Sequence, residues 1–132
     1  NINFSFDKFP SNLHSMEKSQ ILITDNSGIV FEYLFLLKRP VIFLEYKDKI
    51  HNTNLNKIKI EIIDNIFKKK FGNLLNISEI VKLNQLCEEL LIKKNFTDDE
   101  VEDFENKMIS NIGNSYKFAT KVLLDQLNSN DK

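Results

Sequence analysis

The feature that most constrains this chain of 132 residues is a pair of short apolar runs separated by a turn and a longer apolar segment. Residues 21–24 (ILIT) are β-branched and apolar, a pattern typical of a strand buried on both faces. Residues 41–44 (VIFL) have the same character. Two such strands close in sequence predict neighbours in a parallel sheet if the segment between them is a crossover helix.

The segment between the two runs, residues 29–37, is apolar nearly all round, so its length alone fits a helix or a strand. Residues 25–28 (DNSG) before it are of the kind that turns a chain and caps a helix. Lys38, Arg39 and Pro40 follow it, and cations followed by proline are typical of a helix C-terminus. These flanks favour a helix, and the whole predicts a parallel βαβ unit.

The rest of the chain predicts further elements around this unit. Residues 2–6 alternate like a strand, and Leu13 with Met16 suggests a short helix. Residues 55–71 fit both a strand and a helix, and we favour the helix. Three more helices are expected, over residues 78–93, from the capping box at Thr97, and after a break at residues 113–115. We therefore predict an α/β fold with a small parallel sheet and several packed helices.

Length and composition allow one compact domain, which we place at residues 1–127 with a polar tail at 128–132. Eighteen basic and nineteen acidic residues give a net charge of −1, which argues against a nucleic-acid partner. No apolar run is long enough for a membrane span, and no signal peptide opens the chain. Cys87 lies in an apolar helical stretch and is expected to be structural. Since the chain opens on Asn1, we expect a piece of a longer protein.

The residues that suggest chemistry are those of the turn, Asp25, Asn26, Ser27 and Gly28. Ligands of open parallel sheets bind beyond the carboxyl ends of the strands. A helix start at that edge offers backbone N–H groups and a positive dipole end, which suit a phosphate or diphosphate. Ser27 adds a hydroxyl, and Gly28 leaves the backbone accessible. The same four residues are also a common helix cap, so capping without a ligand remains an alternative.

Further candidates surround this turn. Glu32 lies one turn along the predicted helix, where its carboxylate can accept hydrogen bonds from ribose hydroxyls. Tyr46, Asp48 and His51 follow the second strand and are weaker candidates for contacts with a ligand. His14 is expected at the polar surface. The histidines and the cysteine make no metal-binding pattern, and we predict neither a metal nor a cofactor.

Residues 21–43 (ILITDNSGIVFEYLFLLKRPVIF) resemble the CDP-glycerol glycerophosphotransferases, which build teichoic-acid-like polymers. In that family a strand ends in Thr-Asp, a serine-bearing turn starts an apolar helix, and a basic residue with proline introduces the next strand. Weaker similarity continues in residues 71–80 and 114–127. The resemblance implies an incomplete Rossmann-like C-terminal domain of a GT-B enzyme, with Asp25 and Ser27 at the donor diphosphate.

The sequence departs from this family at two places in the turn. Asn26 stands where an aromatic residue is usual, and Gly28 stands where a second serine is usual. Residues 25–32 (DNSGIVFE) also resemble the nucleotide-sugar 2-epimerases, in which the glutamate at the place of Glu32 contacts the ribose. The resemblances thus imply a nucleotide-activated donor, either CDP-glycerol, another CDP-alcohol or a UDP-sugar.

The resemblance also implies what this chain lacks. A GT-B enzyme has two Rossmann-like domains, so the N-terminal half of the enzyme and its general base are expected elsewhere, and this chain alone is expected to be inactive. The expected location is the cytoplasm, at the inner face of the membrane, with peripheral membrane association. Residues 68–70 (KKK) are expected either to be a solvated helix end or to attract an anionic polymer or membrane surface. A non-catalytic α/β interaction module is the alternative from a different class.

Overall fold

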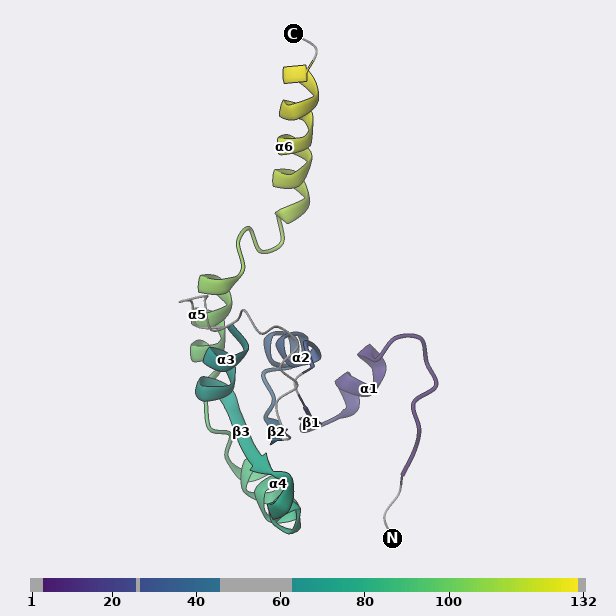
Figure 1. Ribbon diagram of the computed structural model, residues 1–132, viewed down its shortest axis with the longest axis vertical. Helices are drawn as coiled ribbons and strands as arrows, with labels where there is room; N and C mark the ends of the chain where they lie inside the picture. The colour runs from purple at the N-terminus through teal and green to yellow at the C-terminus, as the bar shows by residue number, and fades with distance from the viewer. Residues whose placement is uncertain (1–3, 26, 46–62, 131–132) are drawn as a thin grey trace, which may run out of the picture. The chain divides into compact units, whose positions relative to one another are not determined.

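The computed structural model describes residues 4–25, 27–45 and 63–130 (Figure 1). The chain divides into two compact units, Asn1–Thr97 and Asp98–Lys132. The single domain predicted at residues 1–127 spans both units. The two units are described separately below.

The first unit is an α/β arrangement with a small parallel sheet, as the sequence pattern predicted. Its strands run in the order β1-β2-β3, and both pairs are parallel. Thr24 lies opposite Phe43, and Glu45 lies opposite Asn76. The elements are α1 (Leu13–Lys18), β1 (Leu22–Thr24), α2 (Ile29–Leu37), β2 (Val41–Glu45), α3 (Ile63–Phe71), β3 (Gly72–Asn76), the 3-10 helix η2 (Ile77–Lys82) and α4 (Leu83–Ile92). The predicted βαβ unit is therefore confirmed as β1-α2-β2.

One face of the sheet is covered by α2 and α3 through a cluster of phenylalanines. Phe67 of α3 is fully buried. Its ring centroid lies 4.7 Å from that of Phe31 and 6.4 Å from those of Phe35 and Phe43. These rings come from α2 and β2, and such edge-on aromatic pairs add to the free energy gained by burial. Figure 1 shows α2 and α3 on the same side of the strands.

The opposite face of the sheet is covered by α4. Ile42, Leu75 and Leu90 form a buried cluster there, bordered by partly buried Ile21, Leu44, Leu83, Leu86 and Cys87. Alternating residues of β2 thus face opposite layers, which is why Val41, Ile42 and Phe43 are all buried. Desolvation, with a smaller contribution from Glu88, raises the pKa of the Cys87 thiol. This setting agrees with a structural role for Cys87.

Helix α2 is anchored at its C-terminal end. Tyr33 and Leu34 are fully buried, and the Ser19 hydroxyl donates to the Tyr33 hydroxyl oxygen at 3.0 Å. The helix ends at Leu37, and the C-cap residue Lys38 adopts a left-handed conformation with φ 50°. Arg39 was expected to act as a cation at this helix end, but its guanidinium donates hydrogen bonds to the carbonyls of Glu17 and Ser19 at the end of α1. The expected basic-proline signal therefore marks the helix end, but Arg39 stabilises the neighbouring helix.

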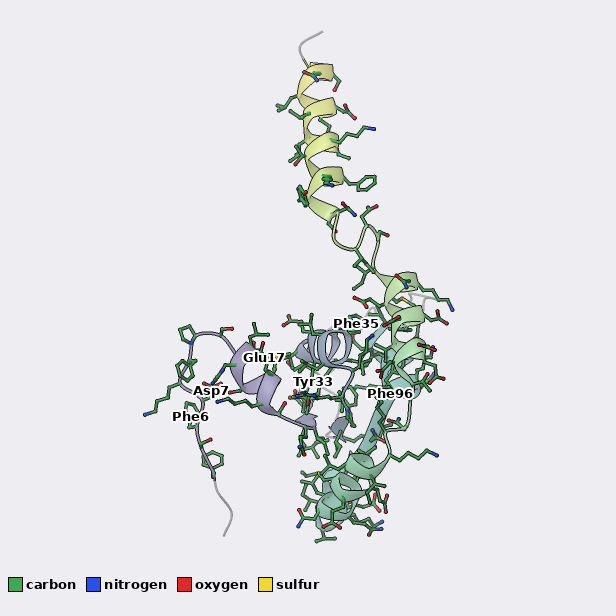
Figure 2. The ribbon with its side chains drawn as sticks, turned by 180° about the vertical axis from the view of Figure 1, so that it is seen from behind. Phe6, Asp7, Glu17, Tyr33, Phe35 and Phe96 are labelled. Carbon is green, nitrogen blue, oxygen red and sulfur yellow. The ribbon has the colours of Figure 1, made fainter. Side chains whose placement is uncertain are left out.

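Several predicted boundaries change. Residues 4–6 form no strand, and Phe4 and Phe6 are 86% and 75% exposed. Figure 2 shows Phe6 next to Asp7 in the segment before α1. β3 was not predicted from the sequence. The helix expected over residues 78–93 is the 3-10 helix η2 followed by α4. Within residues 55–71, the described part forms the helix α3, and residues 55–62 lie outside the described residues.

The second unit consists of α5 (Asp98–Met108) and α6 (Ser115–Asn130). The capping box predicted the start of α5, whose Val101 and Phe104 are buried. Gly113, with φ 73°, lies in the turn before α6, where a side chain would be strained. α6 reaches Asn130, past the point where a polar tail was expected. In the part of the chain that the structure describes, no helix is long and apolar enough to cross a membrane.

Phe67→Ala is expected to destabilise the first unit by about 3–5 kcal/mol, because it removes a buried ring and leaves a cavity among four others, those of Phe31, Phe35, Phe43 and Phe71. Urea denaturation followed by circular dichroism measures this loss. Phe118→Ala in α6 is the matched control, since Phe118 is 53% exposed. Equal losses in the two variants would contradict the assigned role of Phe67.

Gly72→Ala is expected to destabilise the same unit by about 1–3 kcal/mol through overpacking. A Cβ at Gly72 would lie 2.6 Å from the Lys68 carbonyl oxygen and 2.8 Å from the Phe43 ring. The thermal midpoint of the variant tests this close approach. A midpoint equal to that of the unaltered chain would mean that α3 and β2 are not held this tightly.

The turn before α1 predicts a pH-dependent contact at Asp7. The Asp7 carboxylate accepts hydrogen bonds from the Ser15 hydroxyl and from the Phe9 amide, the latter at 2.9 Å. These two hydrogen bonds lower the pKa of the Asp7 carboxyl, and the bond from Ser15 has the larger effect. The contact should thus be complete above the pKa of unfolded Asp7 and be lost as pH falls through the lower folded pKa. An NMR titration should give a higher Asp7 pKa in Ser15→Ala, and an unchanged pKa would contradict the contact.

Candidate functional site

All three described strands are parallel, so their carboxyl ends lie at one edge of the sheet. β1 ends there at Thr24, β2 at Glu45 and β3 at Asn76. The turn after β1 and the start of α2 lie at the same edge, because α2 follows β1 directly. This is the edge at which open parallel sheets bind ligands.

The start of α2 is built from backbone groups. The helix N-cap is Gly28, which has no side chain to cap the helix. Val30 N–H donates to the Ser27 carbonyl at 3.4 Å, and Phe31 N–H donates to the Gly28 carbonyl at 3.2 Å. Gly28 and Ile29 come before Val30 in the chain, and their N–H groups donate no hydrogen bond to any described residue.

The side chains of Asp25 and Ser27 lie at the surface. Asp25 and Ser27 are exposed, and neither side chain has a hydrogen-bond partner among the described residues. Ser27 therefore does not cap α2 in this structure, although capping was one interpretation of the sequence. Its hydroxyl is available to a ligand at the helix start.

Gly28 opens the helix start to its surroundings. A Cβ added at this position would meet no atom within 4 Å, and the φ of −62° is one that any residue adopts. Backbone conformation thus does not require glycine here. The space around Gly28 is instead what an anion needs in order to approach backbone N–H groups at the positive end of α2.

Glu32 lies on the same face of α2 as Gly28, because residues four apart in a helix are neighbours. Its side chain is exposed, whereas Val30, Tyr33 and Leu34 are buried. The structure therefore brings Glu32 and the turn together along one accessible face. The sequence analysis had expected Glu32 one helical turn beyond the turn residues.

The structure adds a residue that the sequence analysis did not consider, Glu45. Phe43 faces the α2 and α3 layer through its contact with Phe67, so alternation places Glu45 on that same side. Glu45 is exposed at the last position of β2, opposite Asn76. The Asn76 side-chain oxygen accepts from the Ser78 amide at 3.0 Å and caps η2. Residues 41–44 are all apolar, so the sequence pattern around Glu45 gives no signal that could have identified it.

The described structure does not test the other residues that were predicted around the turn. Asn26, Tyr46, Asp48 and His51 lie outside the described residues. His14 is exposed in α1, where its ring lies edge-on to Phe9 at 6.0 Å. Among the described residues, no group of three or more histidine, cysteine, aspartate or glutamate side chains could hold a metal ion.

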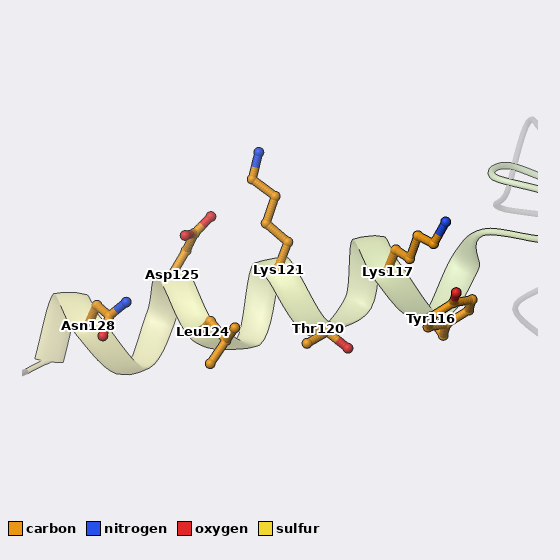
Figure 3. A pocket seen from close by; sticks show the side chains of 7 residues that line it. All are labelled: Tyr116, Lys117, Thr120, Lys121, Leu124, Asp125 and Asn128. Atoms are coloured by element: carbon orange, nitrogen blue, oxygen red, sulfur yellow. The ribbon is translucent and has the colours of Figure 1, made fainter.

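A shallow hollow in the second unit lies along α6 alone (Figure 3). Since one exposed helix supplies its entire lining, it does not enclose a ligand. None of the predicted site residues belongs to it. The lining residues are Tyr116, Lys117, Thr120, Lys121, Leu124, Asp125 and Asn128.

No known protein family, curated protein or solved structure matches this chain. Its function must therefore be inferred from the geometry of the sheet edge and from the sequence pattern that builds it.

Proposed function

We propose that this chain is the nucleotide-binding portion of a transferase that moves glycerol phosphate, or a related alcohol phosphate, from a CDP-activated donor to a cell-surface polymer. The observation that carries the proposal is the open helix start at Ser27 and Gly28, directly after a parallel strand. The resemblance of residues 21–43 to the CDP-glycerol glycerophosphotransferases supports this choice of donor.

In the proposed reaction, a hydroxyl at the end of the growing polymer attacks the phosphorus that carries the glycerol. A new P–O bond forms, the bond to the bridging oxygen of the diphosphate breaks, and CMP leaves. The N–H groups at the start of α2 and the Ser27 hydroxyl would stabilise negative charge on the phosphates throughout. Such preorganised donors lower the barrier because they need no reorganisation during the reaction.

The attacking hydroxyl must lose its proton, and we infer that the general base lies in another part of the enzyme. The acceptor would also bind there, in the N-terminal half that the resemblance implies. The proposed setting is the cytoplasm at the inner face of the membrane, where such polymers are extended, with peripheral association of the enzyme.

A second candidate is a glycosyltransferase or epimerase that uses a UDP-sugar. The shared face of Gly28 and Glu32 favours it, because the similar segment of the nucleotide-sugar 2-epimerases uses a glutamate at this place for the ribose. Both candidates require a nucleotide diphosphate at the same helix start. They differ in the preferred base, so cytidine and uridine ligands distinguish them.

Gly28→Ala is expected to weaken CDP-glycerol binding about tenfold or more, since a methyl group would enter the space that a phosphate requires. The free energy of unfolding of this variant should change by less than about 1 kcal/mol, because φ −62° suits alanine. Alanine caps a helix less well than glycine, but it also lowers the conformational entropy of the unfolded chain, and the two effects offset each other. Calorimetric titration and thermal unfolding of the same variant measure both quantities.

Ser27→Ala should weaken binding by about 1 kcal/mol, on the order of one hydrogen bond. Ser129→Ala in α6 is the matched control and should bind like the unaltered chain. Unchanged affinity in both Gly28→Ala and Ser27→Ala would contradict a phosphate site at the start of α2. Tighter binding of UDP-N-acetylglucosamine than of CDP-glycerol would instead favour the second candidate.

A further inference from the structure

The helices α1 to α4 of the first unit all end at the edge of the sheet opposite to the candidate site. α2 ends shortly before β2 and α3 directly before β3, so both stop where the parallel strands begin. The end of α1 lies beside the start of β2, because the Arg39 guanidinium donates to the Glu17 carbonyl at 2.8 Å. α4 returns to the same place, since Lys94 just beyond it donates to the Lys38 carbonyl at 3.2 Å. We call this end of the sheet the amino edge.

Each of these helix ends carries cations. They lie in the last turn of the helix or in the residues that follow it. The last turns of the same four helices contain two acidic residues, Glu17 and Glu89. The amino edge therefore has an excess of positive charge. Its cations are Lys18, Lys38, Arg39, Lys68, Lys69, Lys70, Lys93 and Lys94.

Some of these cations also contact aromatic rings of the core. Lys68 Nζ lies 5.2 Å from the ring centroid of Phe43, and Lys70 Nζ lies 5.2 Å from that of Phe71. Such contacts fix the position of an ammonium group and leave its charge in place. The charge of the amino edge is thus held on side chains that pack against the first unit.

Exposed apolar side chains stand among these cations. Leu36 in the last turn of α2 is 65% exposed, and Ile92 at the end of α4 is 86% exposed. Because α2 and α4 cover opposite faces of the sheet, the two side chains lie on either side of the strand starts. The helix dipole accounts for cations at helix C-termini, but not for exposed apolar side chains beside them. Cations next to exposed apolar groups are typical of surfaces that bind anionic membranes.

We propose that the amino edge of the first unit docks on the surface of a lipid bilayer that contains anionic lipids. The cations would lie at the level of the headgroups, and Leu36 and Ile92 would enter between them. The membrane setting comes from the proposed function, on which the inference rests in this respect. Because the two edges lie at opposite ends of the strands, a docked amino edge leaves the start of α2 accessible to a nucleotide.

Co-sedimentation of this chain with vesicles of phosphatidylcholine, with and without phosphatidylglycerol, tests the charge. The chain should bind the vesicles that contain phosphatidylglycerol, and added salt should weaken the binding. Lys69→Gln combined with Lys93→Gln should lower the partitioning about thirtyfold, since each lysine at an anionic surface contributes roughly fivefold. Lys8→Gln combined with Lys82→Gln is the matched control, because it removes the same charge from exposed residues outside these helix ends.

A second pair of variants tests the apolar contribution. Ile92→Ser should lower the partitioning about tenfold, because fewer apolar groups leave water when the edge docks. Val81→Ser is the matched control and should bind like the unaltered chain. Val81 is 87% exposed in η2, which follows β3 at the carboxyl edge.

Three results would overturn the inference. The first is no binding to vesicles that contain phosphatidylglycerol, and the second is equal loss in the amino-edge variants and their controls. The third is a loss with the lysine pair but not with Ile92→Ser, which would mean that the edge binds anionic polymers rather than a bilayer.

Calorimetric titration with CDP-glycerol separates this inference from the proposed donor site. Lys69→Gln combined with Lys93→Gln should leave the affinity for CDP-glycerol unchanged, because the amino edge lies away from the start of α2. If the unaltered chain binds the vesicles but not CDP-glycerol, the donor site fails and the docking edge stands. If it binds CDP-glycerol but not the vesicles, the docking edge fails and the donor site stands.

Discussion

The packing of Phe67 against rings from α2 and β2 is the interaction on which the first unit depends. Phe67 is fully buried and contacts Phe31, Phe35 and Phe43, so it joins two helices and the central strand in one apolar layer. This contact holds α2 against the sheet along its length. Because α2 starts where β1 ends, the same contact sets its N-terminus at the carboxyl edge.

The anchoring of α2 leaves its first turn available for binding. Tyr33, Leu34 and the left-handed cap at Lys38 hold the second half of the helix. The residues at its start, Ser27 and Gly28, are exposed. A helix secured at one end can present backbone donors at the other without a loss of core packing. A preorganised phosphate site requires backbone donors that are held in place before the ligand binds.

The sequence predicted the part of the fold in which local pattern and tertiary packing agree. The prediction of strand, helix and strand for residues 21–44 is confirmed, because their apolar runs are unbroken and bounded by turn residues. β3 was missed since it offers only Leu74 and Leu75 as apolar residues and depends on Gly72 fitting against Phe43. Residues 4–6 alternate like a strand but pair with none of the described strands. Glu45 was not considered because its place at the carboxyl edge follows from the pairing of β2 with its neighbours, which no local pattern encodes.

The most direct test of the phosphate site is an NMR titration of the chain with CDP-glycerol, following the backbone amide signals of residues 27–32. If the start of α2 binds the diphosphate, the signals of Gly28 and Ile29 should shift first and most, and those of α6 should not move. Shifts confined to other parts of the chain, or the absence of any shift with saturating ligand, would contradict the site.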